Sequence, residues 1–412
     1  MSLSNGWTGG QYSAFRAAFG AYLFVHFVQL VPWGAELFSG QGVLPRAASP
    51  LLHLFPNVLA LNDSPAVVTA LLVGGAGLSV LFAVGLYDRV AAVGLWYVWA
   101  CLFGRDPLIS NPSLPFVGWM LLAHACLPPA PYGSLAARGR SDPGSGWRFP
   151  QPIFVAAWVV MAVGYSYSGY TKLVSPSWVD GTALSRVLDN PLARPGPLRE
   201  LLLGLPSAFL KVATWGALAL ELGFAPLALF RVVRPWLWSA MLLMHLGLLV
   251  LIDFADLSLG MVLLQLFTFD PAWVAPRRGA AGVLFYDGHC GLCHGFVRFA
   301  LAEDRADRLR FAPLGGDTFR AAVPAAQAAT LPTSLVLRTA DGALRTRSEA
   351  VLGVLAGLGG LWRLLAGLGR LVPRPLRDRL YDGIAAVRHR LFARPADACP
   401  LVPRELRARF GP

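Results

Sequence analysis

Residues 283–294 read Val-Leu-Phe-Tyr-Asp-Gly-His-Cys-Gly-Leu-Cys-His, and this stretch decides the fold expected for the last third of the chain. Its apolar start predicts a short buried strand over 283–287, then a tight turn and a helix over 290–303. Cys290 would lie at the N-terminus of that helix, where unpaired backbone N–H groups and the helix dipole stabilise a thiolate. Cys293 is one turn further on and within reach of a disulfide with Cys290. The stretch therefore predicts a redox-active dithiol.

The two cysteines are expected to have different roles. Cys290, which we expect to be the more exposed, would attack as the thiolate, and Cys293 would resolve the mixed disulfide. His289 is adjacent and would lower the pKa of the attacking thiol further. Asp287 would orient the turn or relay a proton, and an ordinary turn-forming aspartate is the alternative.

Other interpretations of the cysteines stay open at this point. One Cys-x-x-Cys pair can also be half of a zinc site, which His289, His294 and Cys399 would complete. Packed core cysteines are a second alternative. A structural disulfide is disfavoured because the cytosol keeps thiols reduced.

The first two thirds of the chain predict a polytopic membrane domain over residues 1–275. Hydrophobic residues make up 55% of the 412 residues and charged residues only 14%, with a mean hydropathy of +0.54, which is too apolar for an ordinary soluble protein. We expect about eight spans, at 12–31, 65–86, 90–103, 114–127, 153–170, 208–230, 236–252 and 257–274. Several are shorter than the roughly 20 residues that a straight span needs.

The charges of the short loops predict the orientation. One side carries Arg89, Arg138, Arg140, Arg148, Arg231, Arg234, Arg277 and Arg278, and the other carries Arg46, Arg105, Asp253, Asp256 and the segment 173–206. The positive-inside rule makes the first side cytoplasmic. We therefore expect an integral membrane protein of a bacterial inner membrane, with its N-terminus and the dithiol domain in the cytoplasm.

Residues 276–282 are expected to be a linker, and residues 283–412 a second domain with a different pattern. Further strands are predicted at 309–312, 331–337 and 343–346, the last two joined by an Asp341-Gly342 hairpin turn. Ser348 would cap a helix beginning at Glu349, and two more helices follow. This order predicts a thioredoxin-like α/β fold with extra C-terminal helices. Pro332 corresponds to the cis-proline that faces the dithiol in such folds and would contact substrate.

These motifs resemble the DCC family of thiol-disulfide oxidoreductases, named for its Asp-x-x-Cys-x-x-Cys signature. Here the signature is Asp287, Cys290 and Cys293. The resemblance continues through Leu309-Arg-Phe-Ala-Pro-Leu314, Arg347-Ser-Glu-Ala350, Leu371-Val-Pro-Arg-Pro-Leu-Arg-Asp-Arg-Leu-Tyr381 and Cys399-Pro-Leu-Val-Pro403. It implies thiol-disulfide exchange, and it makes Cys399 either a third redox or metal-competent thiol or a packed cysteine of the tail.

A lysine at the end of an apolar span distinguishes the membrane domain. Lys172 lies in Tyr167-Ser-Gly-Tyr-Thr-Lys-Leu-Val-Ser-Pro-Ser-Trp-Val-Asp-Gly181 and is costly there unless it is paired, interfacial or functional. Snorkelling of Lys172 to the headgroups, with Trp178 as an interfacial anchor, is the simplest interpretation. The pattern also resembles the HTTM membrane domain of vitamin K-dependent gamma-carboxylases. That resemblance implies that Lys172 is a base at a quinone site, and Trp178 is a further candidate for binding the substrate. His245 is either a ligand-site residue or a hydrogen-bonded histidine of the bundle.

The sequence as a whole predicts a membrane-bound thiol-disulfide oxidoreductase, possible coupling to a quinone-like lipid, and no metal. Expected partners are a thiol or disulfide protein, or a small thiol, together with membrane lipids. No nucleic-acid partner is expected, because basic charge beside membrane spans is first a signal of topology. The alternatives are a carboxylase-like or lipid-modifying enzyme with an accessory dithiol domain, and a zinc-binding or scaffold membrane protein.

Overall fold

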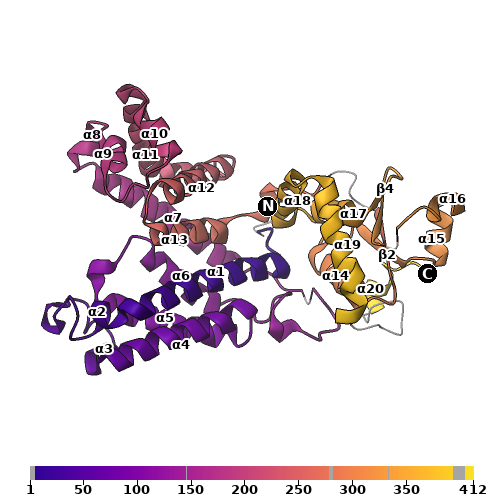
Figure 1. The fold of residues 1–412 in the computed structure, drawn as a ribbon, viewed down its shortest axis with the longest axis horizontal. Helices are drawn as coiled ribbons and strands as arrows, with labels where there is room; N and C mark the ends of the chain where they lie inside the picture. Colours follow the sequence, from indigo (N-terminus) through magenta and orange to yellow (C-terminus); the bar gives the residue numbers. More distant parts are fainter. Residues whose placement is uncertain (1–4, 145, 278–281, 333, 393–403) are drawn as a thin grey trace. The chain divides into compact units, whose positions relative to one another are not determined.

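The computed structural model describes residues 5–412 except 145, 278–281, 333 and 393–403 (Figure 1). It forms two compact units. The helical unit comprises Phe15–Leu127 and Pro150–Phe269. The dithiol unit comprises Met1–Ala14, Pro128–Phe149 and Asp270–Pro412. Residues 1–14 and 128–149 therefore belong to the same unit as the C-terminal domain. The predicted domains, divided at 275–283, did not include these two segments in the C-terminal one.

Each of the eight predicted spans corresponds to a helix. The first half contains α1 (Gly9–Leu30), α2 (Gly34–Phe38), α3 (Val58–Leu61), α4 (Pro65–Val84), α5 (Asp88–Arg105) and α6 (Leu114–Ala125). The second half contains α7 (Gln151–Lys172), α8 (Pro176–Val179), α9 (Ala183–Asp189), α10 (Pro197–Leu203), α11 (Ser207–Ala228), α12 (Arg234–Leu251) and α13 (Ala255–Thr268).

Five helical stretches in the described part of the chain are long and apolar enough to cross a membrane. They are Gly9–Phe38, Pro65–Val84, Gln151–Lys172, Ser207–Ala228 and Arg234–Leu251. Two further apolar helices, α6 and α13, are shorter. The chain thus has the helices of a membrane protein, and the count of eight crossings stays a prediction.

Helices α7 and α11 approach each other closely in the helical unit. Gly169 faces the backbone of Leu222 and Glu221 so closely that an added Cβ would lie 2.7 Å from the Leu222 nitrogen. Pro226 inside α11 cannot donate to the Leu222 carbonyl, and the Ser166 hydroxyl lies 3.2 Å from that oxygen instead. The small Gly169 therefore lets the two helices approach each other closely. The Ser166 hydroxyl satisfies the carbonyl that Pro226 leaves without its helical donor, which allows a proline in this apolar helix.

A four-stranded mixed sheet organises the dithiol unit. The strands are β1 (Gly282–Tyr286), β2 (Leu309–Pro313), β3 (Val336–Thr339) and β4 (Leu344–Thr346), in the order β2-β1-β3-β4. Strand β1 pairs parallel with β2 and antiparallel with β3, and β3 pairs antiparallel with β4. Gly342, with φ +85°, permits the tight β3–β4 turn. The predicted order of strand, helix, strand and hairpin is present.

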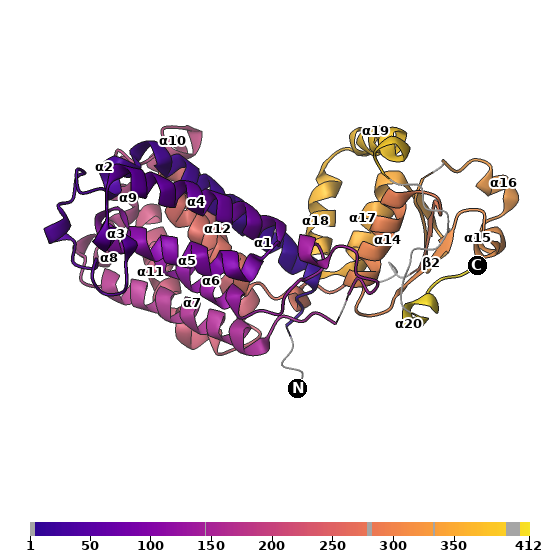
Figure 2. The same ribbon diagram turned by 90° about the horizontal axis from the view of Figure 1, so that it is seen from below.

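Helices lie on both faces of this sheet (Figure 2). The helices of the unit are α14 (Gly291–Glu303), α15 (Asp317–Ala322), α16 (Ala325–Ala328), α17 (Arg347–Leu358), α18 (Gly360–Leu371), α19 (Arg374–Leu391) and α20 (Arg404–Arg407). Leu284 and Tyr286 pack in one core with α14 and α17, while Phe285 packs in another with α15. This alternation along β1 is the pattern expected of a strand that is buried on both sides.

Two predicted boundaries differ from the structure. Strand β3 begins at Val336 rather than at residue 331, because the Leu335 N–H donates to the hydroxyl of Tyr381 at 3.0 Å rather than to a strand. Helix α17 begins at Arg347, so Ser348 lies in its first turn and does not cap it. The Ser348 hydroxyl donates to Asp378 of α19 instead.

Early segments of the chain complete the dithiol unit through specific contacts. Glu303, at the end of α14, is buried and accepts hydrogen bonds from the Gly10 N–H at 2.8 Å, the Trp362 indole at 2.6 Å and the Thr8 hydroxyl. The Ser13 hydroxyl donates to the Tyr132 carbonyl at 2.6 Å. These contacts join the N-terminal segment to both other segments of the unit. Burial raises the pKa of Glu303, although the three donors act in the opposite direction.

Candidate active site

The turn after β1 holds the two cysteines at the start of α14. The Asp287 carboxylate accepts the His289 N–H at 3.0 Å, and the Cys290 N–H donates to the Asp287 carbonyl at 3.3 Å. Cys290 is the N-cap residue of α14, and its Sγ accepts the Cys293 N–H at 3.3 Å. The thiol of Cys290 therefore occupies the place of a helix-capping oxygen, where negative charge is favoured. Both cysteines are unbridged thiols.

The expected difference in exposure between the cysteines is wrong. Cys290 is only 1% exposed and Cys293 is 5% exposed, so neither is a surface thiol. Cys290 is the more buried of the two because its Sγ is turned onto the backbone of α14. Burial, reinforced by the neighbouring Cys290, raises the pKa of Cys293 to about 12. Electrostatics, rather than exposure, distinguishes the two thiols.

Asp287 forms an ion pair that was not predicted. Its Oδ2 lies 3.1 Å from a guanidinium nitrogen of Arg388, whose side chain is 6% exposed. A carboxylate that binds both the turn and an arginine is a positioning group. This geometry favours the orienting role over the proton relay. The Arg388 charge also acts on Cys293, where it opposes the rise in pKa.

An apolar cleft with a volume of about 660 Å³ opens beside Cys293. Its lining includes Leu292, Cys293 and Phe296 of α14, Val351 and Leu352 of α17, and Leu376, Leu380, Tyr381, Ile384 and Arg388 of α19. Tyr381 and Arg388 are two turns apart on α19; the Tyr381 hydroxyl accepts the Leu335 N–H and Arg388 pairs with Asp287. The sequence analysis identified neither of them as a site residue. Their spacing of seven residues on one helix was the sequence pattern that could have indicated them.

The zinc alternative receives no support from the described side chains. His294 Nε2 lies 2.8 Å from the Gly288 carbonyl, and His289 is exposed. Among described residues, no group of three or more His, Cys, Asp or Glu side chains is arranged to hold a metal. Cys399, the predicted third thiol, lies outside the described residues.

The prediction that Pro332 follows a cis peptide bond is wrong. No peptide bond among the described residues is cis, and both Leu331 and Pro332 are described. Pro332 also precedes β3 rather than starting it, and the cleft beside Cys293 is bordered by Leu335.

Lys172 is paired in the helical unit. Its Nζ forms an ion pair with the buried Glu221 of α11 and lies 3.2 Å from the Ser168 hydroxyl. It also lies 4.6 Å from the ring centre of Trp178, which is a cation–π contact. The predicted neighbours Lys172 and Trp178 are therefore together. The partner Glu221 was missed, although a glutamate within an apolar helix is itself an unusual feature.

His245 belongs to a separate buried hydrogen-bonded group. Its Nε2 lies 2.9 Å from the Tyr165 hydroxyl, which also accepts from Gln265 at 2.8 Å. These contacts favour a hydrogen-bonded histidine of the bundle over a ligand-site residue.

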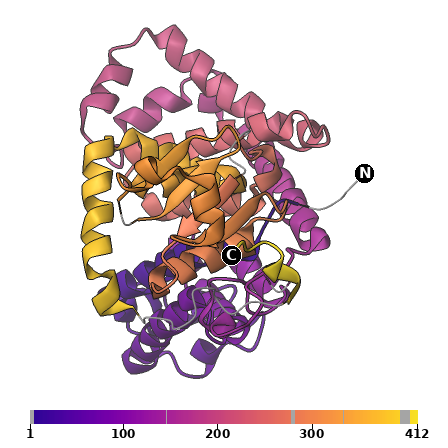
Figure 3. The ribbon, with the colours of Figure 1, turned by 90° about the vertical axis from the view of Figure 1, so that its right-hand side faces the viewer.

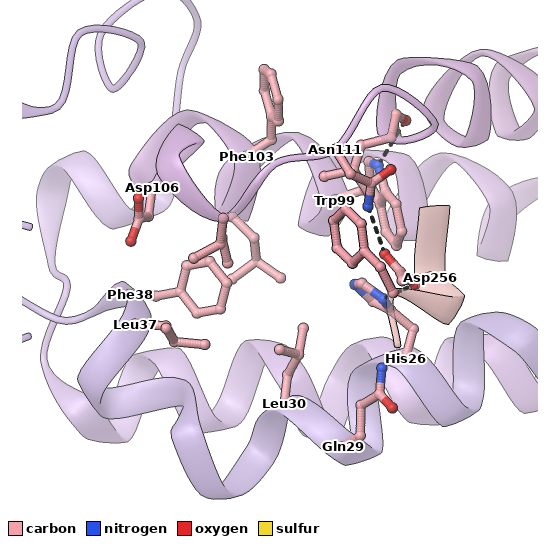
Figure 4. Close-up of a pocket in the computed structure, with 14 residues that line it drawn as sticks. His26, Gln29, Leu30, Leu37, Phe38, Trp99, Phe103, Asp106, Asn111 and Asp256 are labelled. Atoms are coloured by element: carbon pink, nitrogen blue, oxygen red, sulfur yellow. Dashed lines mark hydrogen bonds and ion pairs between the residues drawn. The ribbon is translucent and has the colours of Figure 1, made fainter. Parts of the chain in front are cut away.

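A second polar group borders a cavity of about 200 Å³ in the helical unit (Figure 4). Asp256 accepts from the Asn111 amide at 2.9 Å and from Tyr22 at 2.8 Å, and His26 Nδ1 lies 3.0 Å away. Trp99 stacks near His26, with ring centres 4.5 Å apart. A carboxylate with three partners in an apolar helical unit is a binding-site candidate.

The geometry of the dithiol unit defines a class of protein. Cys290 of a Cys-x-x-Cys pair caps a helix after a buried strand, which is a position that favours a thiolate, and a cleft borders Cys293. Residues 284–394 match the family model described as DCC1-like thiol-disulfide oxidoreductase, and the chain belongs to this family.

Two curated relatives are similar to this chain. The uncharacterized protein YuxK of Bacillus subtilis (strain 168) is 32% identical over 130 residues, which are 93% of that protein and 32% of this chain. The chloroplastic DCC family protein At1g52590 of Arabidopsis thaliana is 29% identical over 119 residues, which are 69% of that protein and 29% of this chain. No solved structure matches the chain.

Proposed function

We propose that this protein is a membrane-anchored thiol-disulfide oxidoreductase that acts through Cys290 and Cys293. The observation that carries the proposal is the capping position of Cys290, whose Sγ accepts the Cys293 N–H. That contact and the helix dipole favour the thiolate of Cys290, whereas burial keeps Cys293 protonated. The thioredoxin-like relationship of the sheet is part of this proposal.

The exchange proceeds in two balanced steps. The Cys290 thiolate attacks one sulfur of a substrate disulfide, forms a mixed disulfide and releases the first substrate thiolate, which takes up a proton. Cys293 then gives up its proton and attacks the Cys290 sulfur, which forms the Cys290–Cys293 disulfide and releases the second substrate thiol. Two electrons pass from the dithiol to the substrate. Because both thiols are buried, a local opening at the turn or the cleft must admit the substrate sulfur.

Trapping of the mixed disulfide tests this mechanism. Full-length protein in detergent, with Cys101, Cys126 and Cys399 changed to Ser, is reacted with 5,5′-dithiobis(2-nitrobenzoate). We expect Cys293→Ser to retain one nitrothiobenzoate on Cys290, and we expect unsubstituted Cys290/Cys293 to end as an internal disulfide without label. Persistent label on Cys293 in the Cys290→Ser protein, formed at the same rate, would reverse the two roles. Absence of any internal disulfide would remove the function.

The assembly of the dithiol unit from three separate segments of the chain supports the membrane attachment. A bilayer cannot separate the parts of one compact unit, so the stretches between its three segments must each cross an even number of times. Apart from a few residues at the ends of the first and last spans, four of the predicted spans lie in 15–127 and four in 150–269. This agreement supports eight crossings, and the loop arginines favour the cytoplasm for the dithiol unit.

A second candidate function concerns the helical unit. We propose that the Lys172–Glu221 pair, with Trp178 over the lysine, is a polar site for the headgroup of a quinone-like lipid. The ammonium group could hold an oxygen atom of such a headgroup and the indole could pack on its ring. A quinone would supply a two-electron acceptor for the dithiol. A carboxylase-like or lipid-modifying enzyme would use the same site for its main reaction.

Lipid extraction distinguishes these candidates. Lys172→Met should lose a co-purifying quinone, whereas Lys211→Met, which changes the only other lysine of the chain, should retain it. If the dithiol is coupled to that lipid, oxidation of Cys290 and Cys293 by added quinone should be lost in Lys172→Met alone. Equal lipid content and equal oxidation in the two variants would refute the quinone site and leave the thiol exchange intact.

A further inference from the structure

Helix α18 exposes an apolar face. It packs on α17 through Ala366 and Gly369, which lies against Leu352. On the opposite face Leu364, Leu368 and Leu371 repeat at spacings of four and three residues. Leu368 is 61% exposed and Leu371 is 79% exposed. A helix that packs by small residues and leaves its leucines exposed has not buried its apolar face within the unit.

Helix α19, which follows α18 after two residues, also exposes apolar side chains. Leu376, Leu380 and Ile384 recur every four residues, and Leu380 is 68% exposed. All three also line the cleft beside Cys293. Figure 3 shows α19, in yellow, standing along one edge of the orange sheet and helices of the dithiol unit. We call these six residues, Leu364, Leu368, Leu371, Leu376, Leu380 and Ile384, the α18–α19 surface.

The charge around this surface is positive. Residues 360–391 contain seven arginines and two aspartates. Arg379 and Arg390 are exposed, and neither forms an ion pair with another described residue. Their aliphatic stems can lie along apolar surface while their guanidinium groups reach outward. An apolar stripe flanked by arginines is the pattern of a helix that lies in a membrane interface.

We propose that the α18–α19 surface docks onto the anionic lipid surface of the membrane that the same chain spans. The chain passes directly between the two units at residues 14–15, 127–128, 149–150 and 269–270, so the dithiol unit is tethered at four points to the unit with the apolar helices. The bilayer is therefore always within reach, and docking is an intramolecular event with a high effective concentration.

Two other occupants fit the surface less well. A second copy of the chain would bring the same positive charge against itself, which opposes association. A peptide segment would need hydrogen-bond partners, but the two arginines in the cleft are already paired, Arg377 with Glu349 and Arg388 with Asp287. Apolar lipid tails need no such partners, and anionic headgroups complement the arginines. Docking would place the opening of the Cys293 cleft at the bilayer interface, where apolar molecules concentrate.

Spin-label accessibility in the full chain tests the proposal independently of thiol chemistry. Cys101, Cys126, Cys290, Cys293 and Cys399 are replaced by serine, and a nitroxide is placed at Leu380→Cys or, as the matched control on the same helix, at Asp382→Cys. Nanodiscs contain phosphatidylcholine with or without phosphatidylglycerol. In anionic discs we expect a several-fold loss of collisions with a water-soluble nickel complex, and a gain of oxygen collisions, at position 380 only.

A further variant tests the electrostatic part. Arg379→Glu with Arg390→Glu should return the label at position 380 to water, as should high salt, which screens the headgroup charge. An unchanged line shape at position 382 shows that α19 remains folded. Nickel access at position 380 that equals that at 382 in anionic discs would overturn the proposal. Protection from both nickel and oxygen would also overturn it, because a protein segment or a second copy would then cover the surface.

Discussion

The raised pKa of Cys293 predicts a quantitative lag in its reactivity. Burial and the neighbouring Cys290 move this pKa from an ordinary 9.0 to about 12. At any pH well below 9, a shift of three pH units leaves about a thousandfold less thiolate. Thiolates of higher pKa are intrinsically more nucleophilic, and a Brønsted coefficient of 0.4–0.5 returns about 16- to 32-fold of that loss. Ionisation alone should therefore make Cys293 about 30- to 60-fold slower than an ordinary thiol.

Alkylation with iodoacetamide between pH 7 and pH 10, followed by peptide mass spectrometry, measures this lag. The exposed Cys126 in the same molecule supplies the reference rate. The Cys293 rate should rise about tenfold per pH unit across the whole range. Poor access to a buried thiol multiplies the rate by a constant at every pH and does not move the plateau, so the profile separates access from ionisation.

The Cys290→Ser protein separates the two causes of the shift. It removes the neighbouring thiol and leaves the burial, which is the larger cause, so the Cys293 rate should still rise through pH 9. A Cys293 rate that levels off below pH 9 in the unsubstituted protein would refute the reasoning, because the thiol would then ionise in its ordinary range. Mixed disulfides on Cys290 would consequently be resolved quickly at neutral pH and would not accumulate.

Three further predictions concern stability. Asp287→Asn, Arg388→Met and the double variant should give a coupling free energy of about 1–3 kcal/mol in urea unfolding, and additivity would show that the ion pair contributes nothing. Glu303→Gln should become more destabilising in thermal unfolding as the pH is lowered. The raised pKa of Glu303 means that protonation relieves the wild-type burial penalty on acidification. The glutamine gains no such relief, and its NH2 group must face the N–H of Gly10 or Trp362, so a destabilisation that shrinks on acidification would contradict this. Ser166→Ala should cost about 1–3 kcal/mol in heat-inactivation assays, because the carbonyl of Leu222 loses its donor; an unchanged midpoint would refute that role.

Local patterns predicted the elements of the dithiol site well. The apolar run before Asp287 and the cysteine spacing led to β1, α14 and the capping position of Cys290, because these features depend on neighbours in sequence. The exposure of Cys290 could not be predicted in the same way. The turn that carries Cys290 is held by Arg388 of α19 through Asp287, and a pairing of residues about a hundred positions apart leaves no local pattern.

The partners of charged residues also could not be predicted from the sequence. Lys172 was recognised as costly in an apolar span, but its partner Glu221 lies on α11, and nothing in the sequence states which helices are neighbours. The same limit applies to Pro332, where an analogy of position did not fix the isomer of the peptide bond. Pairings between distant segments require the packing of helices, which periodicity alone does not specify.

The dithiol unit has a consequence for biosynthesis, because it is assembled from three separated segments. Thr8 is 295 residues away from its partner Glu303. At about 5–20 residues per second, the N-terminal segment must wait roughly 15–60 s for that partner to be synthesised. During the first part of this interval Trp7 and Tyr12 also lack their ring partners Phe149 and Trp147. The segment around Thr8 therefore stays without its partner while the helical unit is synthesised, and the dithiol unit is complete only after the last of its three segments has been made.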